Sequence, residues 1–342
     1  MHPDLVLQPN FPLQTLNTFG IAARANLYAR LDDPAQLSTL RANSRLFSMP
    51  RMLLGGGSNI VLTGDVDALV LHMAIPGKTV LGQQSGSTLV RCGAGENWHG
   101  FVQWTLAQGL GGLENMALIP GTVGAAPIQN IGAYGTELKD VFHALTVVDL
   151  ASGATRSMDA AACRFGYRDS IFKHADGANL VIVDVTFALP LAWQANLRYA
   201  ELAQAVHDAG IATPTAQQIS DLVVAIRRRK LPDPAVIGNA GSFFKNPVVT
   251  AAHCAQLLQQ FPALVHHAQP DGTEKLAAGW LIDQCGWKGR TMGAAGVYAK
   301  QALVLVNHGG ASGGDIVALA RAIQADVAAR YGVQLETEPV FI

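Results

Sequence analysis

The chain has little net charge and few cysteines, and these two features exclude several classes of protein. Its 24 Lys and Arg residues against 25 Asp and Glu residues give a formal net charge of −1, whereas binding to nucleic acid or an anionic membrane needs a clear cationic excess. Its four cysteines stand far apart without a C-x-x-C pair, so neither a zinc motif nor a disulfide framework is indicated. The ten histidines show no H-E-x-x-H or other ligand spacing, and we predict no metal.

Signals for export and membrane insertion are also missing. Residues 1–13 contain no Lys or Arg, which a secretory signal peptide would carry. The longest apolar run, around 180–193, is interrupted by Asp184 and Pro190 and is therefore unsuited to span a bilayer. We expect a cytoplasmic protein.

The chain is long and rich in apolar residues. With 342 residues, of which 49% are hydrophobic and 14% charged, the chain is predicted to be a soluble globular enzyme of two or three domains. Short apolar strands surround a helix expected over 98–108, and this order favours an α+β domain over about 15–190. The pattern then becomes more helical, which places a second domain at 200–342. A capping box of Thr215 and Gln218 begins one of its helices.

Two glycine-rich stretches are candidates for binding a nucleotide. The loop GGGSN at 55–59 can bring backbone N–H groups against phosphate oxygens, although an ordinary tight turn explains it equally well. The run 119–135 combines glycines with the amides of Gln129 and Asn130, which can hydrogen-bond the edge of a flavin. A long structural loop is the less favoured interpretation. Because the chain has no P-loop and no complete G-x-G-x-x-G, a nucleotide would bind to a different fold.

The stretch GNAGSFFKNP at 238–247 contains a candidate for acid–base chemistry. Its glycines let the backbone hold the hydroxyl of Ser242 close to a bound molecule, and two phenylalanines can exclude water around it. Ser242 and Lys245 also match S-x-x-K, but the chain has no S-D-N or K-T-G partner motif, so a penicillin-type nucleophile is not indicated. Likewise GASGG at 310–314 matches G-x-S-x-G without the strand–elbow–helix context, and its serine is interpreted as the start of a helix.

Arginines supply the remaining candidates. In RFGYRDSIF, Arg168 presents a planar fork suited to an enolate or carboxylate, or alternatively forms a surface ion pair with Asp169 or Asp176. The basic run 227–230 is most simply a helix C-terminus favoured by the helix dipole. Lys230, just before the proline turn, is the better ligand candidate.

The chain carries, in order, the motifs GGGSN, GAGENWH, GLENMALIPGTVG, PIQNIGAYG, RFGYRDSIFK, LPDP, GNAGSFFKNP and KLAAGWLID. With this order it resembles the UDP-N-acetylenolpyruvoylglucosamine reductases over about 15–342. The resemblance implies a flavoprotein with the FAD-binding fold of the vanillyl-alcohol-oxidase type and a C-terminal α+β substrate-binding domain. It places the FAD-binding domain at 15–190, with lobes of about 15–75 and 76–190, and the substrate-binding domain at 200–342, whose last strand alternatively returns to the FAD domain.

The resemblance also implies a reaction. Hydride passes from NADPH to FAD and then from flavin N5 to C3 of the enolpyruvyl ether of UDP-N-acetylglucosamine, giving UDP-N-acetylmuramate for peptidoglycan synthesis. By the same resemblance Ser242 donates the proton to C2, while Arg168 and Glu338 support the enol form, Glu338 being a candidate donor to the substrate carboxylate. A positioned proton transfer of this kind contributes roughly 10²–10⁴-fold to the rate.

Two sets of binding residues follow from the family's motifs. For FAD they are Gly55, Gly56, Gly57, Ser58, Asn59, Gly121, Thr122, Gly124, Ala125, Gln129, Asn130 and Gly132. For the UDP-sugar they are Tyr199, Lys230, Asn246, Lys275 and Gln301. Tyr199 marks the longer, loop-containing type of the family, and with Lys230 it is expected to meet the diphosphate.

Two pairs of residues depart from the family's pattern. Ala125 and Ala126 replace small hydroxyl residues, so one hydrogen bond to the flavin is expected to be lost or to come from the backbone. Pro339 and Val340 stand where a hydrophobic residue and an arginine often follow the glutamate, which removes a substrate contact. Because the chain stops four residues after Glu338, the last strand must be held by pairing if that side chain is to stay ordered.

Two other functions stay open at this point. One is a different FAD-dependent oxidase or dehydrogenase that acts on alcohols or sugars with the same fold. The other is a sugar-nucleotide-binding protein without redox activity, since a fold by itself does not establish catalysis. For the reductase implied by the resemblance we expect a monomer.

Overall fold

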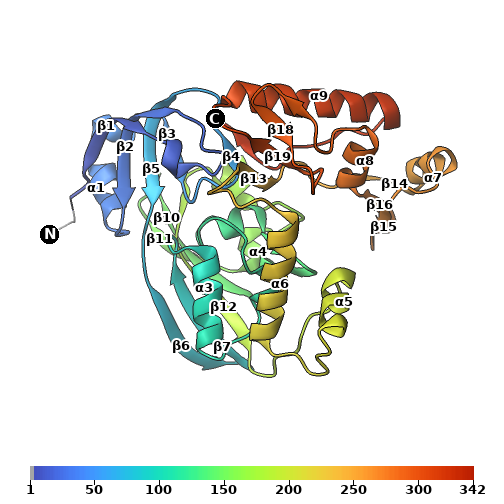
Figure 1. Ribbon diagram of the computed structural model, residues 1–342. Coiled ribbons are helices and arrows are strands. Elements are labelled where there is room, and N and C mark those ends of the chain that lie inside the picture. Colours follow the sequence, from blue (N-terminus) through green and yellow to red (C-terminus); the bar gives the residue numbers. More distant parts are fainter. Residues whose placement is uncertain (1–3) are drawn as a thin grey trace. The chain divides into compact units, whose positions relative to one another are not determined.

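The computed structural model describes residues 4–342, and the contacts within the chain divide it into two units that each combine helices and strands (Figure 1). Unit 1 consists of Met1–Phe11, Ala25–Gly56 and Asp67–Arg228, and unit 2 of Pro12–Arg24, Gly57–Val66 and Arg229–Ile342. The sequence placed a boundary near residue 200, whereas the contacts extend unit 1 to Arg228. The difference arises because two helices after residue 200 bury their apolar side chains in the core of unit 1.

Unit 1 contains two large sheets and most of the short helices. The first sheet has the order β1-β2-β5-β3, with bounds Leu7–Pro12, Arg24–Leu31, Val66–Met73 and Arg51–Leu54. The second has the order β11-β10-β12-β7-β6, with bounds Thr155–Met158, Phe142–Asp149, Leu180–Pro190, Ser87–Gly93 and Lys78–Gln84. A hairpin of β8 (Gly132–Ala133) and β9 (Thr136–Glu137) is added. The helices are α1 (Gln36–Ala42), α2 (Ser44–Phe47), α3 (Trp98–Ala107), α4 (Ala160–Cys163), α5 (Ala200–Asp208) and α6 (Ala216–Lys230).

Strand β12 connects the two apolar cores of unit 1. Its sequence LVIVDVTFALP is nearly free of polar residues, and almost all of it is buried. Ile182 and Val185 lie in one core cluster, although three positions separate them, and Val181 and Val183 lie in the other. Side chains of a regular strand alternate every second residue, so this change of face needs an extra residue. A shift of register between β12 and β10 at this point supplies it as a β-bulge.

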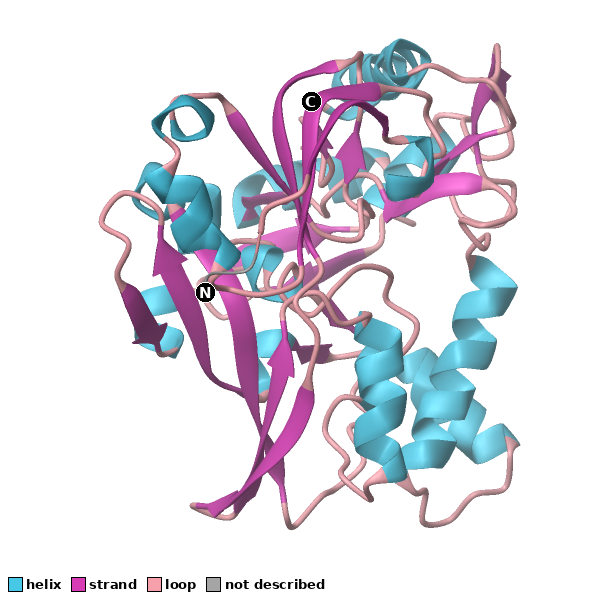
Figure 2. Cartoon of the chain, turned by 90° about the vertical axis from the view of Figure 1, so that its left-hand side faces the viewer, coloured by secondary structure: helices cyan, strands magenta, loops and turns pink. Residues whose placement is uncertain are grey.

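Helices α3, α5 and α6 lie side by side in unit 1, as both ribbon views show (Figures 1 and 2). Each contributes side chains at helical spacing to one core cluster, among them Phe101 of α3, Leu202 of α5, and Ile219 and Val223 of α6. Helix α6 begins with the predicted capping box, because the backbone N–H of Thr215 donates to Gln218 Oε1 at 2.9 Å and that of Gln218 to Thr215 Oγ1 at 3.2 Å.

Unit 2 contains two smaller sheets and three helices. One sheet has the order β13-β19-β18-β17, with bounds Gly238–Ser242, Val304–Asn307, Ala295–Val297 and Thr291–Met292. The other has the order β14-β16-β15, with bounds Val248–Thr250, Thr273–Leu276 and His266–Ala268. The helices are α7 (Ala251–Gln260), α8 (Ala278–Gln284) and α9 (Gly313–Tyr331). The last strand, β20 (Val340–Phe341), pairs in parallel with β4 (Ile60–Val61), a segment inside the first lobe predicted from the sequence.

Two local predictions about helices are confirmed. The helix expected over 98–108 is α3, and Ser312 with Asp315 forms a capping box at the start of α9 rather than a nucleophile elbow. All four cysteines are free thiols. Within residues 4–342 no helix has both the length and the apolar character needed to cross a bilayer.

Candidate active site

Gly55 and Gly56 of the GGGSN loop are required by close packing within unit 1. A Cβ atom on Gly55 would lie 2.7 Å from Thr122 Oγ1, and one on Gly56 would lie 2.8 Å from the Cα of Gly121. Gly124 is equally constrained, since its Cβ would lie 2.5 Å from that of Ala94. Residues 55–56 and 121–122 of the two predicted cofactor loops therefore meet through these contacts, and a side chain at Gly55 or Gly56 would force them apart.

A cavity of about 200 Å³ opens beside this contact. Its lining is mostly apolar and comprises Leu53, Gly55, Met73, Ala94, Thr122, Gly124, Ala125, Ile128, Phe172, Gly177, Ala178, Leu180, Val181 and Ile182. Such a space, bounded by backbone and small side chains, suits part of a flat ring system or its dinucleotide tail. The sequence analysis named Gly55, Thr122, Gly124 and Ala125 among these residues, but not the lining residues of segment 172–182, which have no polar side chain that would mark a site.

Thr122 contributes an unusual polar atom to this cavity. Its Oγ1 is buried without a hydrogen-bond partner, and leaving a buried hydroxyl unsatisfied costs about 1–3 kcal/mol. A ligand with a donor or acceptor at this point would remove that cost. The backbone N–H groups of Ala125 and Ala126 already donate to the Thr122 carbonyl, so they do not replace the hydroxyl groups missing at these positions.

Asn130 shapes the neighbouring loop through its side chain. The residue is fully buried with a left-handed φ of 44°, and its Nδ2 donates to Glu137 Oε2 at 3.1 Å and to the Gly166 carbonyl at 3.0 Å. Its Oδ1 accepts from the backbone N–H of Lys139 at 3.0 Å. Both amide hydrogens of Asn130 thus bond within the protein, and this side chain fixes the path of the loop.

Arg168 lies in a strained turn of unit 1. The turn is closed by the N–H of Gly166, which donates to the carbonyl of Asp169 at 3.0 Å, and Arg168 has φ 54°. This left-handed conformation costs a non-glycine residue roughly 1–3 kcal/mol and is found most often at functional sites. Its Nη2 donates to the Gly132 carbonyl at 3.2 Å, and its guanidinium carbon lies 5.4 Å from the ring centroid of Tyr167.

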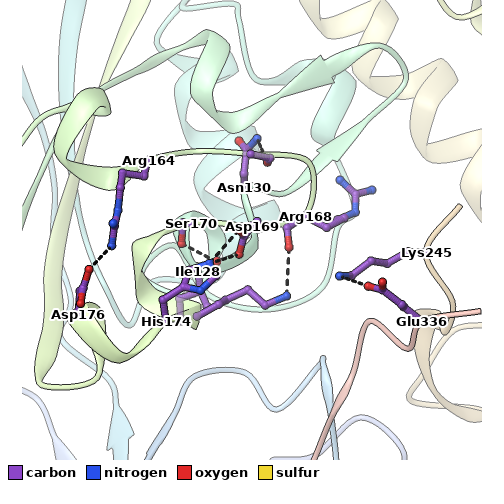
Figure 3. A network of polar contacts seen from close by, with 12 residues as sticks. Ile128, Asn130, Arg164, Arg168, Asp169, Ser170, His174, Asp176, Lys245 and Glu336 are labelled. Carbon is purple, nitrogen blue, oxygen red and sulfur yellow. Dashed lines mark hydrogen bonds and ion pairs between the residues drawn. The ribbon is translucent and has the colours of Figure 1, made fainter. Parts of the chain in front are cut away.

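Two ion pairs near this turn involve the basic residues Arg164 and His174. Arg164 donates to Asp176 at 2.8 Å, and His174 lies 2.9 Å from an oxygen of Asp169 (Figure 3). These are the two carboxylates that offered Arg168 a surface ion pair in the sequence.

Ser242 and Glu338 come from neighbouring backbone segments of unit 2. Ser242 ends β13 and is exposed, whereas Phe243 and Phe244 behind it are 0% and 1% exposed. The N–H of Glu338 donates to the Phe243 carbonyl at 2.9 Å, and Phe244 forms an antiparallel bridge with Thr337. The Lys245 N–H continues the backbone pairing by donating to the Glu336 carbonyl at 2.9 Å. The Lys245 Nζ also forms an ion pair with the Glu336 carboxylate at 2.9 Å (Figure 3). Ser242 and Glu338 therefore lie on paired backbone segments next to two buried phenylalanines.

The C-terminal strand is held by pairing, as the sequence required. The Val340 N–H donates to the Asn59 carbonyl at 3.0 Å, and the Ile342 N–H donates to Val61 at 3.0 Å. Asn59 Nδ2 also donates to the Glu338 carbonyl at 3.1 Å. Asn59 of the GGGSN motif thus fixes the backbone on both sides of Pro339.

Three of the predicted substrate residues gather around the start of α8. The Oδ1 of Asn246 accepts from the N–H of Ala278 at 3.0 Å, and Gln301 Oε1 lies 3.4 Å from where a Cβ on Gly279 would stand. Lys275 lies on β16, three residues before this helix. In unit 1, by contrast, Tyr199 precedes α5 and stacks edge-on against Tyr134, with ring centroids 5.0 Å apart. The structure therefore places these residues in different local settings.

Arg227 and His99 were not singled out from the sequence. Arg227 Nε is buried without a hydrogen-bond partner, and burial lowers the pKa of its guanidinium. Burial, followed by the charges of Arg228 and Arg227, lowers the pKa of His99, whose Nδ1 accepts from the Leu118 N–H at 3.0 Å. The sequence assigned Arg227 to a helix C-terminus favoured by the helix dipole, and its composition could not reveal that the Nε is buried and able to donate to an anion.

Comparison with known protein families gives two matches. A family model described as "UDP-N-acetylenolpyruvoylglucosamine reductase, C-terminal domain" matches residues 233–342, and one described as "FAD binding domain" matches residues 25–159. The second range includes the contact between the two glycine loops.

Individual relatives match over nearly their whole length. The chain is 56% identical over 346 residues to a UDP-N-acetylenolpyruvoylglucosamine reductase of Burkholderia orbicola, covering 99% of each chain. It is 57% identical over 333 residues to one of Paraburkholderia phymatum, covering 97% of this chain and 96% of the relative.

A solved structure shows the same fold. The UDP-N-acetylenolpyruvylglucosamine reductase from Thermus caldophilus superposes with a TM-score of 0.65 at 24% identity, covering 98% of this chain and 99% of that one. Together with the FAD-binding match, this confirms the predicted α+β fold with an FAD-binding domain.

Proposed function

The chain belongs to the family of UDP-N-acetylenolpyruvoylglucosamine reductases, and from this premise we propose how its own residues carry out the reaction. It is an FAD-dependent oxidoreductase that reduces UDP-N-acetylenolpyruvoylglucosamine in peptidoglycan synthesis. We propose NADPH as the co-substrate, a monomer as the working form and the cytoplasm as its location.

The proposed FAD site is formed by the two glycine loops. Gly55, Gly56, Gly121 and Gly124 let the backbone approach the cofactor without obstruction, and the unpartnered hydroxyl of Thr122 offers it a hydrogen bond. The remaining residues proposed for this site are Gly57, Ser58, Asn59, Ala125, Gln129, Asn130 and Gly132, Asn130 acting through the loop path that its side chain fixes. Bound FAD supplies the hydride that reaches C3 of the enolpyruvyl group.

The chain's own part in the reaction is to stabilise negative charge and to deliver a proton. Addition of hydride at C3 leaves negative charge at C2 beside the carboxylate, and a guanidinium is suited to hold such a group through its planar fork. We assign this role to Arg168, whose strained turn and unusual φ support it. Ser242 delivers the proton to C2, and Glu338 supports the enol form from the adjacent backbone segment.

The substrate's sugar nucleotide is assigned to Tyr199, Lys230, Asn246, Lys275 and Gln301. A fixed cation such as Lys230 matches the charge of a diphosphate. The support for Asn246, Lys275 and Gln301 is their shared position around the start of α8.

The observation that carries the proposed mechanism is the backbone pairing that holds Ser242 and Glu338 on neighbouring segments beside the buried Phe243 and Phe244. The test uses the purified yellow enzyme without oxygen. Addition of NADPH should bleach the flavin absorbance, and addition of the enolpyruvyl UDP-sugar should restore it.

Each other function predicts a different outcome. A colourless protein without bound flavin would indicate a non-redox sugar-nucleotide-binding protein. A flavin that is reoxidised by oxygen but not by the enolpyruvyl UDP-sugar would indicate an oxidase acting on another substrate.

A further inference from the structure

Unit 2 contains a cluster of three potential metal ligands in the small sheet that follows the GNAGSFFKNP motif. Cys254 lies on α7, His266 on β15 and Glu274 on β16. The Sγ of Cys254, a ring nitrogen of His266 and a carboxylate oxygen of Glu274 all lie within 4.8 Å of one another. None of these residues belongs to the FAD or UDP-sugar sites proposed above.

The strand register explains how two of the side chains come together. His266 pairs with Leu276 and Ala268 with Glu274 across the antiparallel pair of β15 and β16. His266 and Glu274 are thus diagonal neighbours on one face of the sheet, a relation that lets long side chains touch. His266 Nδ1 indeed lies 2.9 Å from Glu274 Oε2.

Helix α7 supplies the third side chain. It begins directly after β14, with Thr250 as a cap whose Oγ1 accepts from the His253 N–H at 3.2 Å. The buried residues of this helix are Cys254 and Leu257, which define its inner face. The thiol is therefore aimed at the sheet by the same periodicity that buries the leucine, and nothing about the sequence spacing of the three ligands reveals it.

We propose that Cys254, His266 and Glu274 form a binding site for a divalent transition metal of the Zn²⁺ class, with a fourth position open to water or to an external ligand. Cys, His and Glu are the three side-chain types that bind zinc through S, N and O. Three protein ligands and an open position are the arrangement of zinc sites that keep one exchangeable ligand.

The dimensions of the cluster fit such an ion. Zinc bonds of about 2.0–2.3 Å in a tetrahedron hold the ligand atoms roughly 3.3–3.8 Å apart, and the three atoms here lie within 4.8 Å of one another. Rotations of the side chains would have to close the remaining difference of about 1 Å. The closest pair, His266 and Glu274, would exchange its direct contact for two bonds to the metal.

The burial of the three ligands also suits an ion bound at the edge of the unit. Cys254 is 2% exposed, whereas the side chains of His266 and Glu274 are 33% and 18% exposed. A metal held here would have a dry thiolate side and a side that water can reach. The competing interpretation is an ordinary His–Glu ion pair beside a buried thiol, and it predicts no selective uptake of metal.

The test uses the complete flavin-loaded enzyme, first freed of metal with a chelator and then titrated with Co²⁺ as a spectroscopic substitute for Zn²⁺. We expect a tetrahedral Co²⁺ absorption in the red, where oxidised flavin does not absorb, saturating at one equivalent. Zn²⁺ should displace the Co²⁺ and abolish this band. Zn²⁺ should also raise the unfolding temperature, because a ligand that binds the folded state stabilises it.

Matched variants identify the ligands. Cys254→Ser and His266→Gln should each weaken Zn²⁺ binding by at least about 100-fold, since loss of even an outer-shell partner costs roughly 10–100-fold. The controls are Cys285→Ser, which removes a thiol outside the cluster, and His267→Gln, which removes the neighbouring histidine. Both should bind Zn²⁺ as the unmodified enzyme does.

Three outcomes would overturn the proposal. These are the absence of a stoichiometric Co²⁺ band, a band that persists in Cys254→Ser, and equal loss of Zn²⁺ affinity in His266→Gln and His267→Gln. If Cys254→Ser fails to fold, as judged by its flavin content, the two histidine variants decide the question. Because NADPH oxidation is not a readout of metal binding, failure of this site leaves the proposed reductase function unaffected.

Discussion

The hydroxyl groups of Ser242 and Thr122 have different proposed roles, proton donation and cofactor binding, and their surroundings differ accordingly. Ser242 is exposed at the end of a strand, with buried phenylalanines behind it, so its hydroxyl can reach a substrate. Thr122 Oγ1 is buried without a partner, so its hydroxyl can only serve a molecule that enters the cavity. The first is suited to proton transfer and the second to binding.

Replacement of Ser242 separates the two halves of the reaction. Ser242→Ala should leave the bleaching of the flavin by NADPH unchanged and slow its reoxidation by the enolpyruvyl UDP-sugar by roughly 10²–10⁴-fold, since a general acid contributes about that much. Anaerobic stopped-flow absorbance measures both steps. Equal slowing of the two steps would show that the serine supports the cofactor site instead.

Replacement of Thr122 tests the cofactor site. Thr122→Val keeps the shape and removes the hydroxyl, so FAD affinity should fall roughly 2- to 12-fold, the equivalent of one hydrogen bond of about 0.5–1.5 kcal/mol. Equilibrium titration of the flavin-free protein gives the affinity. The control is Thr105→Val, whose hydroxyl bonds within α3 to the Val102 carbonyl and whose loss should leave FAD affinity unchanged. An unaltered affinity in Thr122→Val would exclude the proposed hydrogen bond.

His99 should make stability depend on pH. Its pKa is lowered in the folded protein by burial and then by Arg228 and Arg227, so the unfolded chain binds more protons below the ordinary histidine value of about 6.5. Stability contributed by neutral His99 is present above that value and is lost as the pH falls through and below it. In His99→Asn, whose Oδ1 can still accept from Leu118, the urea midpoint should fall less between about pH 7.5 and about pH 5.5. Parallel curves for the two proteins would contradict this account.

At the scale of the element, helix ends and strand registers place the candidate residues. The bulge in β12 lets one strand face both cores of unit 1, and its residues 180–182 line the cavity beside Thr122. The antiparallel pairing of β15 and β16 places His266 next to Glu274. In each case the register decides which side chains meet, and a shift by one residue would separate them.

The capping box of α9 is an element whose contribution can be measured. In Ser312→Ala the helix loses both the bond from the Asp315 N–H to the serine hydroxyl, 3.2 Å, and the hydroxyl's own bond to the Asp315 carboxylate, 2.7 Å. Ser312→Ala should lower the free energy of unfolding by about 1 kcal/mol, whereas Ser312→Gly should lower it by only about 0.3 kcal/mol. Hydrogen exchange over α9 should report the difference. Equal protection in the alanine variant and the unmodified protein would show that packing alone holds this end of the helix.

At the scale of the whole molecule, unit 2 is assembled from segments far apart in sequence. The N–H of Asn239 donates to the Thr18 carbonyl at 3.0 Å, and Asn307 Nδ2 donates to the Phe19 carbonyl at 2.9 Å. The C-terminal strand then closes the unit against β4. The GNAGSFFKNP motif is consequently supported by residues from the start and the end of the chain.

Removal of the last three residues tests that support. A chain ending at Pro339 loses β20 and its bonds to Asn59 and Val61, so Glu338 should lose its fixed position. We expect FAD binding to be retained and reoxidation by the enolpyruvyl UDP-sugar to be slowed by at least about 10-fold, the loss of roughly one hydrogen-bonded contact to charge. The control, Ile342→Ala, keeps the backbone pairing and should react normally. Full activity of the shortened chain would show that the bonds around Pro339 are dispensable.

The sequence by itself determined the family, the FAD-binding α+β fold and the local helix signals at Thr215 and Ser312, because these depend on motif order and on neighbours three residues apart. Only the tertiary structure decided that Thr122 has an unpartnered hydroxyl, that Arg227 has a buried Nε, and that Cys254 approaches His266 and Glu274. The burial of a residue and its distance from residues remote in sequence depend on packing and strand register. Motifs in the amino-acid sequence do not contain this information. The histidine spacing therefore predicted no metal, while the folded chain places a thiol, an imidazole and a carboxylate within reach of one ion.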